Sequence, residues 1–481
     1  MSWRYILSIT GFLVLMLGAA MVLPLGVGLL YQDGGFSALA VAMGLTLAAG
    51  GGLYWGWKKY RSDYVTPREG MAIVTIGWAA VGLFGALPFW LSGTCGVVDA
   101  VFESVSGFTT TGASIYTDPG ALPEGLLLWR SLIQWLGGMG IIVLSLAILP
   151  FLGVGGMQLY KAEVPSPVPD KLKPRVRETA MVLWKVYVLF TAAEILLLLF
   201  GGMSLFDAVC HAFTTMPTGG FSPKTASVAH YDSAYFDTVF IVFMVLAGIN
   251  FSLHYQMLRG QPLALWRDAE CRFFLGIFAV MTAVVGFDVW HEVYADIGAA
   301  IRYGAFQVAS ILTTTGYATA DYETWPALSQ LILLIAMFIG ASAGSTGGGM
   351  KCLRVMLYFK FCYKELFRLI HPHAVSRVKL AGKTVPEDVM HSVLGFLGLY
   401  TGLFALSAVL LAALGVDFVT AFAAVAASIG NIGPGFGAVG PAENYAQIPY
   451  LGKWLLIFCM LLGRLEIYTV IILLVPEFWR K

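Results

Sequence analysis

Four segments of the chain combine threonine, glycine and small residues in a way that suits the binding of a dehydrated cation. They read SGFTTTGA from Ser106, TTMPTGGF from Thr214, SILTTTGY from Ser310 and GNIGPGFG from Gly430. Glycine permits backbone conformations that turn successive carbonyl groups the same way. A ring of carbonyl oxygens can replace the hydration shell of an ion. Four loops in one chain are enough to close such a ring.

The spacing of these loops indicates an internal repeat. Alignment on the glycine before Ala, Phe, Tyr and Phe matches Gly112, Gly220, Gly316 and Gly435, which lie roughly a hundred residues apart. One TTTG or GPGFG sequence alone is weak, because glycine and small residues are common wherever membrane helices pack. Four together favour a filter over a packing element. Loop four lacks threonine and loop two carries Pro217, so the predicted ring is only pseudo-fourfold.

The elements that position the loops are predicted to be membrane-spanning helices. The chain has 481 residues, of which 58% are hydrophobic and 12% are charged; a soluble domain is about half apolar and a quarter charged. A spanning helix needs about 20 mostly apolar residues. Ten runs qualify, and the first is interpreted as a retained helix and not a cleaved signal. They lie near residues 5–30, 36–57, 70–92, 126–152, 179–202, 236–258, 272–290, 326–350, 389–414 and 449–475.

Four shorter apolar segments precede the four loops directly. They cover residues 97–108, 205–216, 299–312 and 418–430. Segments of this length cannot span a bilayer and are candidates for re-entrant helices. Each would direct the negative C-terminal end of its helix dipole at the following loop, which favours a cation there.

The distribution of charge predicts the orientation of the spans. Basic residues follow spans two, four, six and eight, and acidic residues occupy the alternate connections. The basic set is Lys58, Lys59, Arg61, Arg68, Lys161, Lys171, Lys173, Arg175, Arg177, Arg259, Arg267, Lys360, Lys364, Arg368, Arg377, Lys379 and Lys383. The positive-inside rule then places both termini in the cytoplasm and all four loops on the outer side. The outer acids would concentrate cations, unless they only mirror the insertion rule.

The loop motifs resemble those of the Trk/Ktr/HKT superfamily of potassium transporters, and especially its bacterial TrkH/TrkG type. The motifs SGFTTTGA, MPTGGFS, TTTGYATAD and GNIGPGFG carry the resemblance, which covers essentially the whole chain. It implies an all-α polytopic membrane protein with four pseudo-fourfold M1–P–M2 repeats, like a potassium channel fused into one chain. The implied divisions are a two-helix extension (1–62) and repeats at 63–165, 166–262, 263–378 and 379–481.

The resemblance also implies which residues form the filter. Backbone coordination of K⁺ is expected from Thr110, Thr111, Gly112, Thr218, Gly219, Gly220, Thr314, Thr315, Gly316, Gly433, Pro434 and Gly435, with Asn431 and Ile432 as flanks. Serine in place of the first filter glycine is associated with sodium selectivity in some plant members. Gly112 therefore favours potassium, although the sequence does not give the K⁺/Na⁺ ratio.

The eighth span contains the unusual segment GASAGSTGGGMK, from Gly340 to Lys351. It fails as a phosphate-binding loop, because Met350 precedes the lysine and Cys352 follows it. One interpretation is close helix packing. The other, which the resemblance favours, is an unwound gating segment at 340–350. Its gating residues would be Gly344, Gly347, Gly348, Gly349 and Lys351, although Lys351 could instead mark a helix end by snorkelling.

Arg464 is an ionisable residue inside the last span, where such residues usually face a cavity or a partner. Glu466 is a poor partner for it, because residues two apart on a helix point in different directions. Arg464 is therefore a structural pair with another helix or, by resemblance, a basic gating barrier beneath the filter. His211, Asn250 and His254 are interpreted as hydrogen-bonded packing residues.

The sequence shows no catalytic triad, carboxylate pair or metal cluster, and its six cysteines lack ligand spacing. We therefore expect no enzyme activity, no cofactor within this chain and no nucleic-acid partner. The alternative to a pore is a proton- or sodium-coupled potassium symporter, for which we find no convincing intramembrane acid beyond Glu466. Both readings place the chain in the bacterial cytoplasmic (inner) membrane.

The resemblance implies two partners. One is a cytosolic TrkA-like RCK subunit that binds NAD(H), ATP or ADP, and the other is a second copy of the chain in a homodimer. The basic connections at 161–185 and 354–383 are candidate docking surfaces, or they merely obey the orientation rule. Which nucleotide opens the pore does not follow from the sequence.

Overall fold

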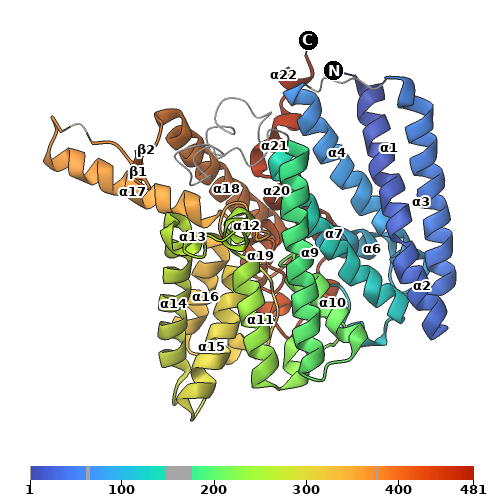
Figure 1. Ribbon diagram of the computed structural model, residues 1–481, viewed down its shortest axis with the longest axis horizontal. Coiled ribbons are helices and arrows are strands. Elements are labelled where there is room, and N and C mark those ends of the chain that lie inside the picture. The colour runs from blue at the N-terminus through green and yellow to red at the C-terminus, as the bar shows by residue number, and fades with distance from the viewer. Residues whose placement is uncertain (1, 61–65, 148–175, 375, 481) are drawn as a thin grey trace.

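Most of the described part of the chain is helical (Figure 1). The computed structural model describes residues 2–60, 66–147, 176–374 and 376–480. Within these residues the predicted all-α class holds, with one exception. The strands β1 (Lys379–Leu380) and β2 (Lys383–Thr384) form a two-residue antiparallel pair on the arm beyond α17.

The first three helices lie beside the rest of the fold as an extension. They are α1 (Trp3–Ala20), α2 (Val22–Tyr31) and α3 (Phe36–Trp57). Glycines allow α1 and α3 to pack closely, as small residues do between membrane helices. A Cβ on Gly50 would lie 2.6 Å from the Leu15 nitrogen, and one on Gly11 would lie 2.6 Å from the Tyr54 nitrogen.

The same order of elements then occurs four times: a long helix, a short helix, a loop and a further helix. The first set is α4 (Pro67–Gly85), α5 (Leu87–Leu91), α6 (Val97–Phe108) and α7 (Glu124–Ala147). The second is α9 (Val176–Phe200), α10 (Leu205–Thr215), α11 (Ala234–Ala247), α12 (Phe251–Leu258) and α13 (Ala264–Arg267). The third is α14 (Ala269–Val289), α15 (Ile297–Leu312), α16 (Ala327–Ile339) and α17 (Cys352–Ile370). The fourth is α18 (Glu387–Ala413), α19 (Phe418–Gly430), α20 (Tyr450–Arg464), α21 (Ile467–Ile471) and α22 (Pro476–Trp479).

The four short helices α6, α10, α15 and α19 match the predicted re-entrant segments closely. Two begin and end as expected, and the others differ by one or two residues. In three of them the side chain of the N-cap residue accepts a hydrogen bond from a backbone N–H of the first turn. These N-cap residues are Ser204, Asp296 and Asp417. Such caps satisfy donors that a helix start leaves free. The last turns of α6, α15 and α19 are buried, and in α10 only Phe213 is partly exposed.

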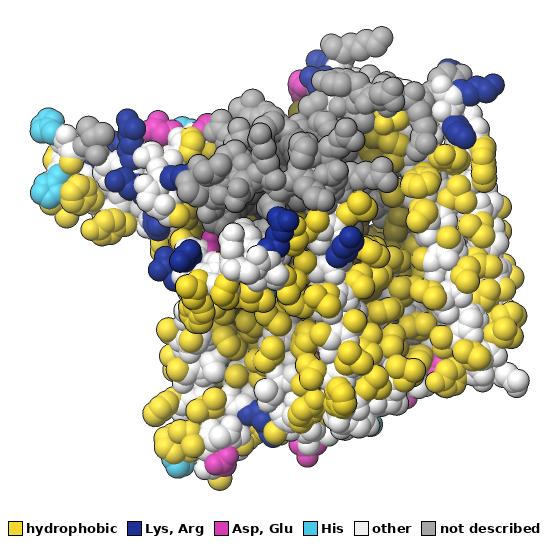
Figure 2. Space-filling view, viewed as in Figure 1, with side chains coloured by type: hydrophobic (Ala, Val, Ile, Leu, Met, Phe, Trp, Pro, Cys, Tyr) yellow, Lys and Arg dark blue, Asp and Glu magenta, His cyan; other side chains and the backbone are white. Residues whose placement is uncertain are grey.

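The long helices are suited to a bilayer. Among the described residues, six helices are long and apolar enough to cross a membrane, and up to eight spans result if each of two bent pairs counts as one. Figure 2 shows a broad band of hydrophobic side chains bordered above by Lys and Arg. The fold is that of a multi-pass membrane protein. The end of the predicted span 126–152, and Arg61, Lys161, Lys171, Lys173 and Arg175, lie outside the described residues, as does most of the 161–185 connection.

Three predicted spans are interrupted, where the sequence suggested one. As expected, the eighth span is broken: α16 ends at Ile339 and α17 begins at Cys352. The prediction of continuous helices at 236–258 and 449–475 is wrong. The chain bends by 101° between α11 and α12, and by 119° between α20 and the helical turns that begin with α21. Asn250 N-caps α12 after the first bend. Glu466 adopts φ +59° at the second bend, where its carboxylate pairs with Arg354.

Candidate functional site

The helices α6, α10, α15 and α19 end in one shared backbone motif. In each, a residue in the left-handed region bonds through its N–H to the carbonyl three residues back, and the next N–H bonds to the carbonyl five residues back. This is the Schellman arrangement of a helix C-terminus. The four left-handed residues are Thr110 (φ 51°), Thr218 (56°), Thr314 (62°) and Asn431 (54°). Asn431 is therefore the structural equivalent of the three threonines.

A second left-handed residue follows two positions later in every loop. These residues are Gly112 (φ 81°), Gly220 (76°), Gly316 (84°) and Gly433 (99°). The predicted alignment on Gly435 is therefore wrong by two residues. Gly435 is not left-handed, and its N–H bonds to the Val439 carbonyl at 2.7 Å. The end of α19 sets the register of the fourth loop. The sequence alignment had instead matched the glycine before the aromatic residue Phe436.

The corrected fourth segment is Asn431–Gly433, and Pro434 and Gly435 lie beyond it. We call Thr110–Gly112, Thr218–Gly220, Thr314–Gly316 and Asn431–Gly433 the four glycine loops.

The glycine loops contact one another in a closed cycle. A Cβ added to Gly112 would collide with the Gly219 carbonyl of loop two, and one on Gly220 with the Thr315 carbonyl of loop three. A Cβ on Gly316 would collide with the Ile432 carbonyl, and one on Gly433 would lie 2.8 Å from the Thr111 carbonyl. Each loop thus packs against the next, and the fourth returns to the first. All four left-handed glycines also line one shared cleft.

Two side chains from outside the loops, Gln134 and Tyr445, brace two of these loops. Gln134 on α7 donates from Nε2 to the Gly219 carbonyl (2.7 Å) and accepts from the Phe221 N–H (3.1 Å). Tyr445 donates to the Gly433 carbonyl at 2.7 Å. A carbonyl oxygen has two lone pairs, so these donors leave one acceptor site on each carbonyl. Sequence reasoning missed Gln134, which carries no local motif.

A buried ion pair supports the chain just after loop one. Glu103 on α6 accepts from Arg130 Nε at 2.7 Å and from the Ile115 N–H at 2.9 Å. Arg130 also donates to the Ser222 carbonyl (3.1 Å). Sequence reasoning missed both residues. Comparison of the repeats could have found Glu103, because Gln307 stands at the same distance before Thr314 as Glu103 does before Thr110.

Loops two and three are joined by a hydroxyl cluster. The Tyr317 hydroxyl lies 2.5 Å from Thr214 Oγ1 and donates to the His211 carbonyl at 3.0 Å. His211 is fully buried, and its imidazole contacts the Tyr231 hydroxyl at 3.2 Å. His254 contacts the Leu246 carbonyl at 2.8 Å. The interpretation of these histidines as hydrogen-bonded packing residues is confirmed.

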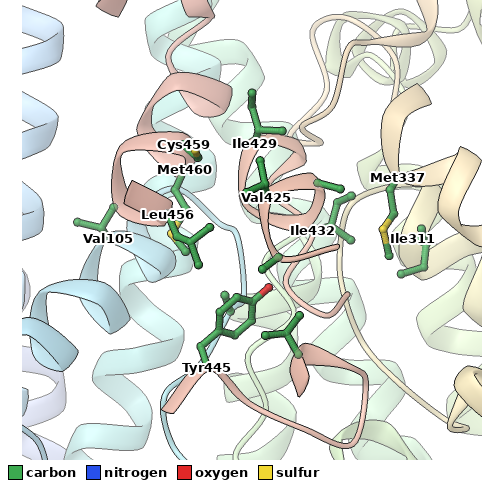
Figure 3. Packing of buried hydrophobic residues seen from close by; sticks show 14 of the residues in the cluster. Val105, Ile311, Met337, Val425, Ile429, Ile432, Tyr445, Leu456, Cys459 and Met460 are labelled. Carbon is green, nitrogen blue, oxygen red and sulfur yellow. The ribbon is translucent and has the colours of Figure 1, made fainter. Parts of the chain in front are cut away.

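Two acceptor oxygens at the first loop position lack a hydrogen-bond partner. Thr110 Oγ1 and Asn431 Oδ1 are buried without one. The Asn431 amide nitrogen donates to Thr111 Oγ1 at 3.0 Å. Ile432, by contrast, turns an apolar side chain into the core, between Val425 and Met337 (Figure 3). The Asn431 side chain lies beside α20, where a Cβ added to Gly463 would come within 2.8 Å of its Oδ1.

The Gly-rich segment lies against the inner ends of three glycine loops. The Gly348 N–H donates to Thr314 Oγ1 (2.7 Å), and the Gly349 N–H donates to the Gly430 carbonyl (2.9 Å). Thr346 Oγ1 donates to the Met216 carbonyl at the end of α10 (3.0 Å). The predicted unwinding of this segment is confirmed, because no helix covers residues 340–351.

Two positively charged side chains, Arg464 and Lys351, donate hydrogen bonds to the Gly-rich segment. Arg464 is buried and donates to the Thr346 carbonyl at 2.6 Å, and more weakly to the Gly137 carbonyl at 3.4 Å. Lys351 folds back to donate to the Gly347 carbonyl. The prediction that Lys351 snorkels at the cytoplasmic end of a helix is therefore wrong. Lys351 directly precedes α17, and its side chain turns toward the Gly-rich segment. Glu466 pairs with Arg354 at 2.7 Å, a partner that the sequence did not suggest, and this agrees with the expectation that it is a poor partner for Arg464.

A buried acid was also missed. Glu194 lies in α9 with no exposed surface, and among the described residues neither of its carboxyl oxygens has a hydrogen-bond partner. Thr215, whose hydroxyl donates to the His211 carbonyl at 2.9 Å, is a close neighbour. The statement that Glu466 is the sole intramembrane acid of interest is therefore wrong. The run of leucines after Glu194 places it within an apolar span, although two of these leucines, Leu196 and Leu197, are exposed.

Within the described residues, no group of three His, Cys, Asp or Glu side chains could hold a metal ion. All six cysteines are free thiols, four of them buried. The site that remains is the ring of glycine loops with the Gly-rich segment beneath it.

Comparisons with known proteins show the family to which the chain belongs. The family model described as cation transport protein TrkH matches residues 37–481. The chain is 43% identical, over the full length of both proteins, to the Trk system potassium uptake protein TrkH of Escherichia coli K12. It is 38% identical to TrkG of the same strain over 99% of each chain. The crystal structure of the potassium transporter TrkH from Vibrio parahaemolyticus superposes with a TM-score of 0.92 at 37% identity, with both chains fully covered. The chain belongs to the TrkH family of cation transport proteins.

Proposed function

We propose that this protein carries potassium into the bacterial cell through a single-chain pore whose selectivity filter is the ring of four glycine loops. The observation that carries the proposal is the closed cycle of contacts, in which all four loops share one backbone conformation. The family is one of cation transporters and not of enzymes. The choice of potassium rests on the names of the relatives, which are potassium uptake proteins.

The backbone of the loops suits a dehydrated cation. Alternating left-handed residues orient carbonyl groups in a way that straight strands cannot. The four short helices direct their negative ends at the loops. The left-handed glycines of all four loops line one shared cleft, which gives the ion a common path past the loops. The filter residues are then those of the corrected register, with Ile432 inside the filter and Pro434 and Gly435 outside it.

The Gly-rich segment 340–350 is the proposed gate. It lies against the inner ends of loops two, three and four through Thr346, Gly348 and Gly349. Glycine-rich backbone can exchange between conformations at low steric cost. Arg464 adds a buried positive charge beside the segment. A cation leaving the filter would meet both, so a move of the segment would open the path.

The cytoplasmic side is proposed to be the face that carries both termini and α17. Positive residues border the apolar band on that face (Figure 2), as the positive-inside rule requires. The membrane is proposed to be the bacterial inner membrane. The basic connections 161–185 and 354–383 would then face the cytosol and be open to a soluble partner.

Two partners are proposed. The first is a cytosolic TrkA-like RCK subunit carrying NAD(H), ATP or ADP, because the relatives are named as parts of a Trk system. The second is another copy of this chain. The arm formed by α17 projects from the body (Figure 1) and exposes Tyr363, Leu366, Leu369 and Ile370. An apolar face of this size is typical of an interaction surface.

Ion-coupled symport is the second candidate. It requires an acid that gains and loses a proton, or binds sodium, as transport proceeds. Glu103 and Glu466 are held by arginines, which disfavours that role for them. Glu194, which is buried in α9, is the candidate for that role. An imposed proton or sodium gradient that is obligatory for potassium uptake would favour symport.

Rubidium uptake into proteoliposomes tests the pore. The purified protein should pass Rb⁺ down its own gradient with no second ion gradient imposed, and K⁺ should compete better than Na⁺. Variants at Gly433 and Gly435 serve as the matched pair for the filter. Absence of flux with the RCK subunit and NADH, ATP and ADP supplied in turn would refute the pore.

A further inference from the structure

The base of the Gly-rich segment is a closed stem. The Met350 N–H donates to the Phe338 carbonyl (3.2 Å), and the Cys352 N–H donates to the Ala341 carbonyl (3.0 Å). These bonds join the end of α16 to the start of α17, so residues 342–349 form a loop with a fixed neck. A loop held in this way moves as a unit only if its neck opens or shifts.

One carboxylate oxygen joins both sides of this neck. Glu270 Oε1 accepts from the Ala343 N–H at 2.6 Å and from the Leu353 N–H at 3.2 Å. Ala343 and Leu353 are almost fully buried, and Glu270 is only 6% exposed. Hydrogen bonds to an ionised acceptor are about twice as strong as neutral ones. Glu270 therefore holds the neck closed from a different helix.

The chain segment that ends at Glu270 also contacts the Gly-rich loop through the residues at its own start. Residues 248–270 comprise the bend after α11, helices α12 and α13, and the first turn of α14. At its start, the Gly248 carbonyl accepts from the Ser342 N–H (3.0 Å), and the Phe251 N–H donates to the Gly344 carbonyl (3.1 Å). At its end stands Glu270. We call residues 248–270 the bracket segment, because both of its ends bond to the loop.

The bracket segment reaches the surface between these two attachments. Leu258, Leu263 and Trp266 are more than half exposed, and Arg259 and Arg267 lie on the same stretch. In the fold, α13 packs against α14, and α14 packs against α17. A force on this surface stretch would act on both ends of the bracket and so on the neck of the loop.

We propose that Glu270 is a positioning residue for conduction, which locks the neck of the Gly-rich loop and couples it to the surface bracket segment 248–270. This inference rests on the proposed gating role of the loop. With Glu270 in place, the Gly-rich loop (residues 342–349) stays in contact with the four glycine loops of the filter. Loss of the carboxylate frees the neck, and the bracket no longer controls the loop.

The test uses Glu270→Ala and Glu270→Gln in the full chain, with Asp288→Ala as the matched control. Asp288 lies near the outer end of the same helix α14, where its carboxylate accepts from the Ser329 N–H (2.9 Å) and hydroxyl (2.6 Å). It thus makes a similar latch to α16 away from the loop. Glutamine keeps one acceptor oxygen but not the charge, so an intermediate effect is expected.

The native thiol of Cys352 reports the state of the neck directly. It is fully buried, and its Sγ lies 3.2 Å from the Gly340 carbonyl. Cys459, fully buried in α20 next to Ser407, is the internal control for global unfolding. The measurement is the rate of maleimide modification at each cysteine by peptide mass spectrometry, together with basal Rb⁺ flux in proteoliposomes without any partner.

The expected result is a rise of about tenfold in both the Cys352 modification rate and the basal flux of Glu270→Ala, because two bonds to a charged acceptor are lost. Cys459 should stay protected, and Asp288→Ala should leave both readouts unchanged. Wild-type values for a folded Glu270→Ala would overturn the inference. If Cys459 also becomes reactive in Glu270→Ala, that variant is unfolded and the Glu270→Gln variant is the deciding test. Faster modification of Cys352 but not of Cys459 in Glu270→Gln supports the inference, and wild-type rates at both cysteines overturn it.

Arg464→Ala separates this inference from the gating proposal. Arg464 contacts the same loop at Thr346, independently of the neck. If Arg464→Ala raises the flux and Glu270→Ala does not, the role of Glu270 falls while the gate stands. If neither variant changes the flux, the gating role of the loop falls as well.

Discussion

The guanidinium of Arg464 donates a 2.6 Å hydrogen bond to the carbonyl oxygen of Thr346. The bond joins the last repeat to the Gly-rich segment of the third. It places the one buried arginine of α20 beside the segment that lies against the glycine loops. The sequence left open whether Arg464 is a structural partner or a barrier, and this contact allows both.

Arg464→Ala should raise Rb⁺ flux by about tenfold, because one charged hydrogen bond to the loop and one buried positive charge are lost. Arg464→Lys keeps the charge without the planar donor fork. A lysine variant that conducts like wild type would assign the effect to charge, and one that conducts like alanine would assign it to the bond. Unchanged flux in the alanine variant would remove Arg464 from the gate.

Gly112→Ser should lose potassium preference over sodium. A side chain at this position collides with the Gly219 carbonyl and is strained at φ +81°, at a cost of about 1–3 kcal/mol. The loop must then shift, and the spacing of the carbonyl ring changes. Competition of K⁺ and Na⁺ for Rb⁺ uptake measures the ratio. Unaltered competition would show that loop one does not select the ion.

The register of the fourth loop gives a sharper test. Gly433→Ala should impair Rb⁺ flux and selectivity, because the residue is left-handed at φ +99° and its Cβ would lie 2.8 Å from the Thr111 carbonyl. Gly435→Ala should have a smaller effect, since its Cβ would meet Ala423 at 3.1 Å with ordinary backbone angles. The reverse order of severity would restore the alignment on Gly435.

Glu194→Leu should raise the thermal stability of the protein in detergent. The substitution removes a buried carboxyl group with no hydrogen-bond partner, which relieves about 1–3 kcal/mol. Glu103→Leu is the opposite case, because it strands Arg130 without its partner and should cost about 3–5 kcal/mol. A melting temperature lowered by Glu194→Leu would show that Glu194 holds a stabilising contact, and would revive its candidacy in ion coupling.

Asp417 should make the stability of the fourth short helix depend on pH. The side chain and N–H of Thr420 hold the pKa of the Asp417 carboxyl below its ordinary value of 3.8. A lowered pKa means that the stabilisation is full above about pH 4 and is lost as the pH falls through the folded-state value. At neutral pH, Asp417→Ala should cost about 1 kcal/mol as a lost N-cap.

The melting difference between wild type and Asp417→Ala should therefore narrow below pH 4. A constant difference from pH 6 to pH 3 would mean that the carboxylate charge does not contribute to the cap.

The sequence by itself determined the local elements of this protein. Apolar runs predicted the spanning helices, and their shorter counterparts predicted α6 and α19 to the residue. These features follow from neighbours along the chain: hydrophobic length, capping residues and glycine. The break at 340–351 belongs to the same class, because the density of glycine alone disfavours a helix there.

Only the tertiary structure decided how these elements meet. Gly433 of loop four packs against the Thr111 carbonyl of loop one, which lies three repeats away. The bend before Glu466 accompanies its pairing with Arg354, and the neck of the Gly-rich loop depends on Glu270 from α14. Such contacts join residues far apart in the chain, so no local pattern encodes them. They exist because buried charges and backbone N–H groups must find partners within the packed helices.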